Sequence, residues 1–312
     1  MPVMPTQRHE PLTGRTILLA AQRRDRPHAF ASDGSVTEAE CPFCAGREER
    51  TPPEITRRGD PDWTVRVVPN KYPAVSAADE FDAAEPAAMG RHEVIIESGR
   101  HDDSFLEVSD AHSDEIVEVW VERFGVLSVD PRHASVILFH NQGARAGESI
   151  AHPHSQIVGL PFVPERVALE TSAYREGSCV LCKVIERASE STLIVDQNEA
   201  FILIAPWASR LPYQMWAIPR SHEPDIGSLS RQHVRGLAAI LRSALGKINR
   251  VLPGESINWS IQQAPVNPSR PFHWYLEIVP RVTVFGGFEL STGTYINIVD
   301  PEHTAALFRT AK

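Results

Sequence analysis

Two sets of cysteines and histidines recur along this chain at matching positions. Each set begins with a Cys-x-x-Cys pair and continues with two histidines that are 51 positions apart in both sets. The first set is Cys41, Cys44, His101 and His152, and the second is Cys179, Cys182, His222 and His273. An identical spacing after an identical pair indicates an internal repeat, and a repeat constrains the fold more than any single motif does.

The sequence between these residues follows one pattern in both copies. Two strand-like segments are followed by a long helical segment and then by two more strand-like segments. The first copy has them at 63–75, 92–101, 110–127, 134–143 and 152–160, and the second at 200–212, 213–222, 230–248, 257–265 and 272–280. We therefore expect an α+β protein with two histidine-containing domains, 1–165 and 166–312, each with its own largely antiparallel sheet and flanking helices. The Ala/Asp/Glu-rich stretch 75–90 predicts a surface loop inserted in the first copy.

Each set has the composition of a structural zinc site. Two cysteines and two histidines fill the tetrahedral shell that zinc prefers and leave no position open for a substrate. We expect two structural zinc sites, with iron as an alternative in one of them because imidazole also binds iron. A redox role for the Cys-x-x-Cys pairs is the competing interpretation, but that motif normally occurs once in a chain.

The motif His-Pro-His-Ser-Gln at 152–156 differs from its counterpart in the second copy. On a strand, alternate residues share a face, so His152, His154 and Gln156 line up together. If His152 binds metal, His154 is left as a free imidazole that can act as a general base or as a nucleophile. The second copy has Tyr275 at the corresponding position, so we expect one working site per chain.

Hydrogen-bond donors surround this motif in the sequence. Gln156 shares the face of His154, and the upstream segment 140–149 contains two glycines and several polar side chains. Such a loop suits phosphate oxygens, and a donor-rich pocket around an imidazole fits attack on phosphorus. The candidate phosphate contacts are Arg23, Arg26, Asn70, Asn141, Gln142 and Ser149.

Composition excludes some partners. The formal net charge is −9 and we find no basic stripe, which disfavours a nucleic-acid binder. No run of about 18 apolar residues occurs, and the first residues have no apolar core of a secretory signal. We expect a cytoplasmic protein without a membrane or nucleic-acid partner.

The sequence resembles the galactose-1-phosphate uridylyltransferase branch of the histidine triad superfamily. The resemblance rests on the segments "PLTGRTILLAAQRRDRP", "CPFC", "VPNKYPA", "FHNQGARAGES", "HPHSQ" and "FGGFEL", which span about residues 11–290. It implies a duplicated histidine-triad fold, a homodimer and ping-pong transfer of a nucleoside monophosphate. Ser155 stands where uridylyltransferases usually have glycine, which is more similar to the ADP-glucose phosphorylase group.

The resemblance also implies roles for individual residues. His154 matches the nucleophile, Gln156 the glutamine that binds the transferred phosphoryl group, and Glu289 a hexose-hydroxyl contact. The first Cys/His set matches zinc ligands. The residues that match nucleotide-phosphate contacts are Arg23, Arg26, Asn70, Asn141, Gly147 and Ser149. Thr283 and Tyr295 replace the family's lysine and glutamine near the hexose phosphate.

We therefore expect a nucleotidyltransferase that moves UMP or AMP from a nucleoside diphosphate sugar to a sugar 1-phosphate through a nucleotidyl-histidine. One alternative is a phosphorylase of the ADP-glucose type, with inorganic phosphate as the acceptor. Two others are hydrolysis of the nucleotide by water and a zinc-stapled nucleotide-binding module without turnover.

Overall fold

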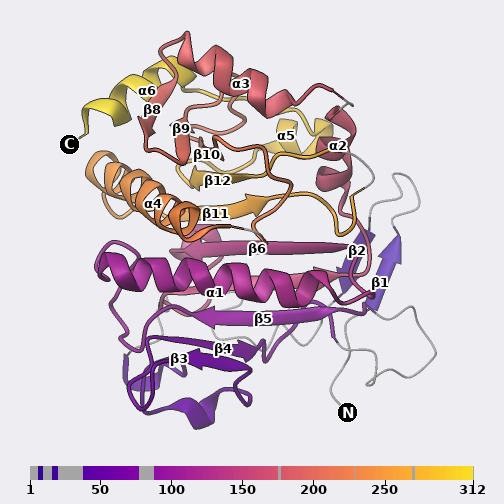
Figure 1. Ribbon diagram of the computed structural model, residues 1–312, viewed down its shortest axis with the longest axis vertical. Coiled ribbons are helices and arrows are strands. Elements are labelled where there is room, and N and C mark those ends of the chain that lie inside the picture. The colour runs from indigo at the N-terminus through magenta and orange to yellow at the C-terminus, as the bar shows by residue number, and fades with distance from the viewer. Residues whose placement is uncertain are drawn as a thin grey trace.

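Ten strands of the chain form one continuous antiparallel sheet (Figure 1). The computed structural model describes residues 6–9, 16–19, 38–76, 88–174, 177–227, 229–268 and 271–311. In spatial order the sheet consists of β3 (Thr56–Arg58), β4 (Val65–Pro69), β5 (Arg91–Ile96), β7 (His154–Leu160), β6 (Ser135–Gln142), β11 (Ile257–Gln262), β12 (Tyr275–Pro280), β10 (Met215–Pro219), β9 (Phe201–Ile204) and β8 (Ile194–Gln197). A separate hairpin pairs β1 (Thr6–His9) with β2 (Thr16–Leu19).

The strand order shows the internal repeat. From the outer edge to the middle, β3-β4-β5-β7-β6 in the first half corresponds to β8-β9-β10-β12-β11 in the second. Each half has one outer strand more than the sequence predicts. The prediction of two separate sheets is wrong, because β6 pairs with β11 from Gln142↔Ile257 to Phe139↔Ser260. This pairing satisfies the backbone groups of two strands that would otherwise be exposed sheet edges.

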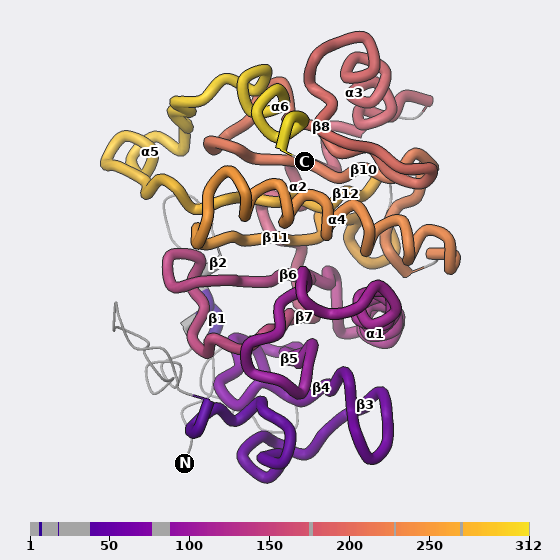
Figure 2. Tube along the Cα trace, turned by 90° about the vertical axis from the view of Figure 1, so that its left-hand side faces the viewer, coloured from indigo at the N-terminus to yellow at the C-terminus, as the bar shows by residue number. Residues whose placement is uncertain are grey.

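The helices complete the α+β architecture. They are α1 (Asp110–Ser128), α2 (Glu165–Ala173), α3 (Val180–Ser189), α4 (Arg231–Val251), α5 (Gly287–Thr292) and α6 (Pro301–Thr310). The two long helices, α1 and α4, lie side by side on one face of the sheet (Figure 1). Each begins at a serine N-cap, Ser109 or Ser230, whose side chain accepts a hydrogen bond from a backbone N–H in the first turn. α5 lies on the opposite side of the sheet from α1 (Figure 2).

The main core lies between α1, α4 and the sheet. Trp120 of α1 and Trp259 of β11 are among its largest fully buried side chains. One buried ion pair crosses this core, where Arg123 of α1 makes two hydrogen bonds to Glu93 of β5, of 2.8 and 2.9 Å. Because β7 lies inside the sheet, all seven of its residues are buried, and its side chains are held by neighbours on both faces.

None of the helices in the described ranges is both long and apolar enough to cross a membrane.

Candidate active site and metal centres

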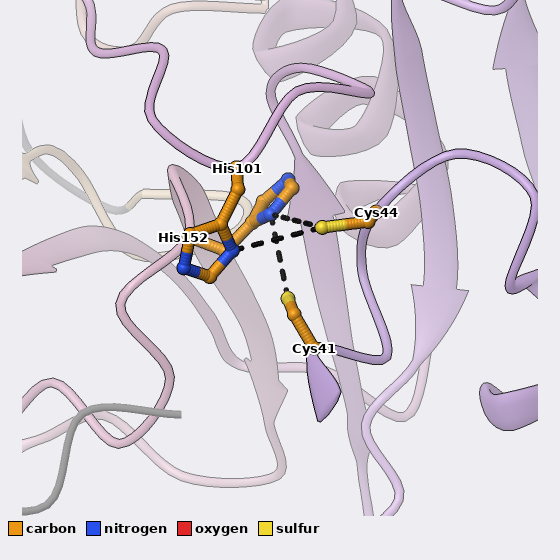
Figure 3. A group of neighbouring side chains, drawn as sticks. All are labelled: Cys41, Cys44, His101 and His152. Atoms are coloured by element: carbon orange, nitrogen blue, oxygen red, sulfur yellow. Dashed lines mark hydrogen bonds between the residues drawn. The ribbon is translucent and has the colours of Figure 1, made fainter. Parts of the chain in front are cut away.

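The first Cys/His set is assembled where β5 ends and β7 begins (Figure 3). Its Cys41 and Cys44 precede β3, His101 follows β5, and His152 directly precedes β7. Their ligand atoms all lie within 4.8 Å of one another. Cys41 Sγ is 3.5 Å from His152 Nδ1, and Cys44 Sγ is 3.6 Å from His101 Nδ1. A tetrahedral zinc with bonds of about 2.3 Å to sulfur and about 2.1 Å to nitrogen needs S···N edges of about 3.6 Å.

The second set repeats this geometry in the other half. Cys179 Sγ is 3.5 Å from His273 Nδ1, and Cys182 Sγ is 3.7 Å from His222 Nδ1. Cys179 is the N-cap of α3 and Cys182 lies in its first turn. The structure therefore brings all eight predicted ligands together as two groups of four that could each hold a metal ion.

In one histidine of each cluster, a hydrogen bond made by Nε2 leaves Nδ1 as the nitrogen that can bind a metal. His152 Nε2 donates to the Ser98 carbonyl at 2.8 Å, and His273 Nε2 donates to the Pro219 carbonyl at 2.9 Å. With the proton on Nε2, each Nδ1 presents its lone pair to the two thiols. This backbone support of a histidine ligand is typical of metal sites, so the donor sets fit zinc.

His154 lies next to the first cluster with its own proton position defined. His154 Nδ1 is 2.7 Å from the carbonyl oxygen of His152, so Nδ1 carries the proton and donates it. Nε2 therefore keeps its lone pair. Burial lowers the pKa of His154 to about 4, against the opposing effect of this hydrogen bond. The imidazole is neutral at pH 7, as a nucleophile must be.

A cavity of about 130 Å³ opens beside His154. Of the predicted site residues it is lined by Asn70, Ser149, His154 and Gln156, and Phe43, Val68 and Val94 add apolar walls. His154 and Gln156 share one face of β7, as predicted. A cavity with an unprotonated imidazole, amides and a hydroxyl on apolar walls can bind a phosphorylated ligand and attack it.

Three of the predicted phosphate contacts in the described part of the chain do not line this cavity. Asn141 lies on β6, where its Oδ1 accepts a hydrogen bond from Asn258 Nδ2 at 2.8 Å. Gln142 ends β6, and Gly147 follows a short 3-10 helix with a φ of 86°. Arg23 and Arg26 lie outside the described residues.

Glu289 is also absent from the cavity of its own chain. It lies in α5, where its Oε2 accepts a hydrogen bond from the backbone N–H of Gly286 at 3.0 Å. Figure 2 shows α5 projecting away from the strands of the first half.

Sequence reasoning missed three buried polar residues next to the motif. Glu97 and His140 lie under Ser155, on the face of β7 opposite His154, and His92 lies beside Gln156. His92 and Glu97 belong to none of the motifs, and His140 lies in the segment 139–149 without an expected role of its own. The strand register that brings the three together was not readable from the sequence. His140 faces Ser155 directly in the β6–β7 pair.

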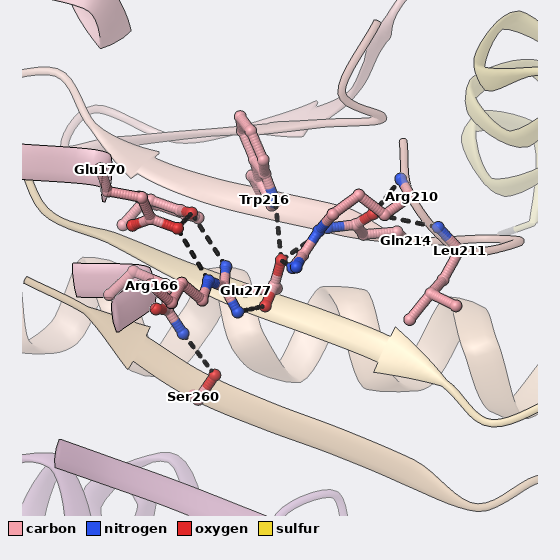
Figure 4. Close-up of polar contacts among 10 residues, drawn as sticks. Arg166, Glu170, Arg210, Leu211, Gln214, Trp216, Ser260 and Glu277 are labelled. Atoms are coloured by element: carbon pink, nitrogen blue, oxygen red, sulfur yellow. Dashed lines mark hydrogen bonds and ion pairs between the residues drawn. The ribbon is translucent and has the colours of Figure 1, made fainter. Parts of the chain in front are cut away.

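In the second half, charged side chains gather on the strand face that corresponds to the face of His154 and Gln156 in the first half (Figure 4). Glu277 occupies the place that Gln156 has in the first half. It accepts hydrogen bonds from Arg166 Nη1 at 2.7 Å, Arg210 Nη2 at 2.6 Å and Gln214 Nε2 at 2.6 Å. Its neighbour Tyr275 contacts Arg166 as well. This arrangement supports the prediction of one working site per chain.

Comparison with known proteins identifies the family. The family model for the galactose-1-phosphate uridyl transferase N-terminal domain matches residues 3–164, about half of the chain. An ADP-glucose phosphorylase of Arabidopsis thaliana is 33% identical over 98% of this chain and 92% of the relative. The chain belongs to the galactose-1-phosphate uridylyltransferase family.

Other members of the uridylyltransferase family agree with this. The galactose-1-phosphate uridylyltransferase of Thermotoga maritima is 25% identical, with 97% of both chains covered. The crystal structure of an Arabidopsis thaliana ADP-glucose phosphorylase with bound ADP-glucose superposes with a TM-score of 0.81 at 32% identity, covering 99% of each chain. The predictions of this family, and of an enzyme of the nucleotidyltransferase type, are confirmed.

Proposed function

We propose that this enzyme transfers a nucleoside monophosphate from a nucleoside diphosphate sugar to a phosphate acceptor, with His154 as the covalent carrier. The observation that carries the proposal is the hydrogen bond from His154 Nδ1 to the His152 carbonyl. It leaves Nε2 as an unprotonated nucleophile beside the Gln156 amide in the cavity.

The reaction then takes two displacements at one phosphorus. The Nε2 lone pair of His154 attacks the α-phosphorus, the bond to the bridging oxygen breaks, and sugar 1-phosphate leaves with that electron pair. An oxygen of the acceptor next attacks the same phosphorus, the P–N bond breaks, and the neutral imidazole is restored. Gln156 and Ser149 donate hydrogen bonds to the phosphoryl oxygens, and loss of one such donor typically costs about 10²–10³-fold in rate.

We assign the two Cys/His groups to structural zinc. Four protein ligands complete the shell, so the metal's role is to hold His152 and therefore the start of β7. Iron remains an alternative in one group because imidazole binds it as well. Reduced thiols at both sites also suit the cytoplasm, where we place this protein.

Two acceptors follow from the relatives. A sugar 1-phosphate acceptor makes the enzyme a hexose-1-phosphate nucleotidylyltransferase, as in the Thermotoga relative's name. Inorganic phosphate makes it a sugar-nucleotide phosphorylase. The 33% identity to an ADP-glucose phosphorylase over 98% of the chain makes ADP-glucose with phosphate the first pair to test.

The decisive experiment is labelling of the protein. Wild-type protein is incubated with ADP-glucose or UDP-glucose labelled in the α-phosphate, quenched, and examined for acid-labile, base-stable label. We expect label from at least one donor, and its release by inorganic phosphate or by a sugar 1-phosphate identifies the acceptor. His154→Gly should abolish labelling while the metal content stays unchanged. Metal-replete wild-type protein that takes no label from either donor would sink the proposal.

We also propose a homodimer. Apolar side chains are strongly exposed along residues 284–298, with Val284 78%, Leu290 75% and Ile298 75% exposed. A contiguous exposed apolar segment of this kind marks an interface. Glu289 lies within it and outside its own cavity, so we propose that a second copy covers the segment and that Glu289 serves that copy's sugar.

Sedimentation tests the dimer. Leu290→Asp with Ile298→Asp should shift the wild-type dimer to monomer, because each charge would have to be desolvated in the interface. Val129→Asp is the control, since Val129 is 79% exposed at the end of α1, far from this segment in the sequence. A monomeric wild-type protein, or a double variant that stays dimeric, would contradict the assignment of this surface.

A further inference from the structure

A buried histidine outside every motif contacts the side chain of Gln156. His92 lies on β5 and is 6% exposed. Val94, two residues further along β5, is the partner of Gln156 in the β5–β7 pair, so the side chains of His92 and Gln156 lie on the same face. His92 Nε2 is 3.0 Å from Gln156 Oε1.

The backbone determines which nitrogen of His92 carries the proton. The N–H of Ala74 donates to His92 Nδ1 at 3.0 Å, so Nδ1 must be the unprotonated acceptor. The proton is then on Nε2, which donates to Gln156 Oε1. A histidine in the other tautomer would place two N–H groups against each other at Ala74 and a lone pair against the Gln156 oxygen.

Asn70 is a second hydrogen-bond donor to the side-chain oxygen of Gln156. Its Oδ1 accepts the backbone N–H of Tyr72 at 2.8 Å, which leaves its amide nitrogen facing the site. That nitrogen, Nδ2, is 3.2 Å from His92 Nε2 and 3.4 Å from Gln156 Oε1. Because the Ala74 N–H places the proton of His92 on Nε2, Asn70 Nδ2 donates to the Gln156 oxygen. Gln156 therefore has its oxygen turned toward two donors, His92 and Asn70, and its NH₂ group is the end available to the cavity. A glutamine turned the other way would present its oxygen to an anionic phosphoryl group.

The second half has a corresponding contact, which is made by different residue types. Trp216 is the partner of Glu277 in the β10–β12 pair, as Val94 is of Gln156, and Gln214 precedes Trp216 by two residues. Gln214 Nε2 donates to Glu277 Oε1 at 2.6 Å. A donor two residues along the neighbouring strand thus faces the same carboxamide or carboxylate position in both halves. Glutamine in place of histidine is compatible with this geometry.

We propose that His92 is a positioning residue that fixes the carboxamide of Gln156 with its NH₂ group toward the transferred phosphoryl group. The inference rests on the proposed nucleotidyl transfer. His92 is not among the residues that line the cavity, so it acts through Gln156, by supplying an Nε2–H donor from one face of the sheet.

The test compares two substitutions of His92 in single-turnover labelling by the donor that labels the wild type. His92→Leu removes the donor to Gln156, and we expect the labelling rate constant to fall by about 10–100-fold. The upper end of this range equals the smallest typical effect of losing a hydrogen-bond donor to the phosphoryl group itself, about 10²-fold. His92→Gln, the residue type that the second half uses, should stay within about threefold of the wild type. In a Gln156→Ala background, His92→Leu should have almost no further effect, because the group that it positions is gone.

The matched control is Gln214→Leu, which removes the equivalent contact in the half without a nucleophile. It should leave the labelling rate constant of the folded protein unchanged. Equal losses for His92→Leu and His92→Gln, or a His92→Leu variant as fast as the wild type, would overturn the proposal.

A second measurement does not depend on activity or on the stability of a variant. Nitrogen-15 NMR of selectively labelled wild-type protein should show His92 with the proton on Nε2 and an unprotonated Nδ1. The opposite tautomer would overturn the inference even if His92→Leu fails to fold. If the wild type takes no label from either donor, the proposed function fails, whereas the tautomer still decides how Gln156 is held.

Discussion

At the residue scale, Ser155 acts on the face of β7 that points away from the substrate cavity. Its hydroxyl donates to Glu97 Oε1, and His140 Nδ1 is 3.2 Å from the same hydroxyl. Burial alone would raise the pKa of Glu97, but the charge of His140 and the hydrogen bonds from His140 and Ser155 hold it below its usual value. The corresponding pair in the second half is Ile261 and Leu276, so the polar trio belongs to the catalytic half alone.

Ser155→Ala should therefore affect stability more than chemistry. The substitution leaves a fully buried carboxylate with one donor fewer, which costs about 1–3 kcal/mol in the free energy of unfolding. Urea unfolding at pH 7 measures this, and the labelling rate constant of the folded protein should change by less than about threefold, because the hydroxyl faces away from the cavity.

Ser135→Ala is the control for that measurement. Ser135 is equally buried, but among the described residues its hydroxyl has no hydrogen-bond partner. Its removal should change the unfolding free energy by less than about 0.5 kcal/mol. Unchanged stability of Ser155→Ala together with a large loss of labelling would instead place Ser155 in contact with the substrate.

At the scale of elements, α2 connects the two halves and is attached to β12 by contacts of Arg166 and Glu170 with Glu277 and Tyr275. Arg166 of α2 pairs with Glu277 of β12, and Arg210 pairs with the other oxygen of the same carboxylate. Burial opposes ionisation of Glu277, but hydrogen bonds and charge from Arg166, with the charge of Arg210, hold its pKa below its usual value. The second half thus uses the strand face that corresponds to the face of His154 and Gln156 to hold a helix.

Glu277→Gln should destabilise the protein in a pH-dependent way. A carboxyl with a lowered pKa in the folded state stabilises fully above its unfolded pKa, and that contribution is lost as the pH falls below it. At pH 7 the substitution should cost about 1–3 kcal/mol, since both arginines are about one-third exposed. The difference between wild type and variant should shrink on acidification below about pH 4.5.

Glu122→Gln serves as the comparison for Glu277→Gln. Glu122 on α1 pairs with Arg58, and both side chains are about one-third exposed, at 38% and 31%. Solvent screens such a pair, so its loss should cost less than about 1 kcal/mol. A pH-independent difference for Glu277→Gln in unfolding experiments would show that its charge is not what stabilises α2.

The eight strands of the repeat and its two long helices were predictable from the sequence, whereas the helices α2, α3, α5 and α6 and the lateral contacts between strands were not. Hydrophobic periodicity placed α1 and α4, and the repeated spacing placed all eight residues of the metal groups. The β6–β11 pair depends on which two strand edges meet, and no local pattern encodes that. The contacts of Ser155 with Glu97 and His140, and of Gln156 with His92, depend on the register of β7 with β5 and β6, which no local pattern encodes.

At the scale of the whole molecule, the joined sheet links the half that we propose to be catalytic to a half that we propose to support it. The two Cys/His groups that could hold a metal stand in equivalent places, each between a Cys-x-x-Cys segment and the strand that follows the second histidine. Only the first adjoins a strand that carries the proposed nucleophile, His154. The assignment of domains 1–165 and 166–312 stays a prediction, since the shared sheet joins the two units between β6 and β11.

Removal of single metal ligands should separate the two roles. Cys44→Ser should lose one metal ion per chain and most of the labelling, because His152, and with it the start of β7, is no longer held. Cys182→Ser should also lose one metal ion, and its midpoint of thermal unfolding should fall by about 5 °C or more, but its folded fraction should label at the wild-type rate. Elemental analysis measures the metal content, and calorimetry measures the unfolding midpoint.

The thiols should make metal binding at both places depend on pH. Burial and the neighbouring cysteine raise the pKa of Cys44 to about 12 and that of Cys182 to about 11, so without a cation both thiols keep their protons at pH 7. Metal binding must displace these protons, and chelators should therefore strip the metal more readily as the pH falls.

Labelling lost in Cys182→Ser to the same extent as in Cys44→Ser would show that the second half takes part in the chemistry. The division between a catalytic and a supporting half would then be wrong.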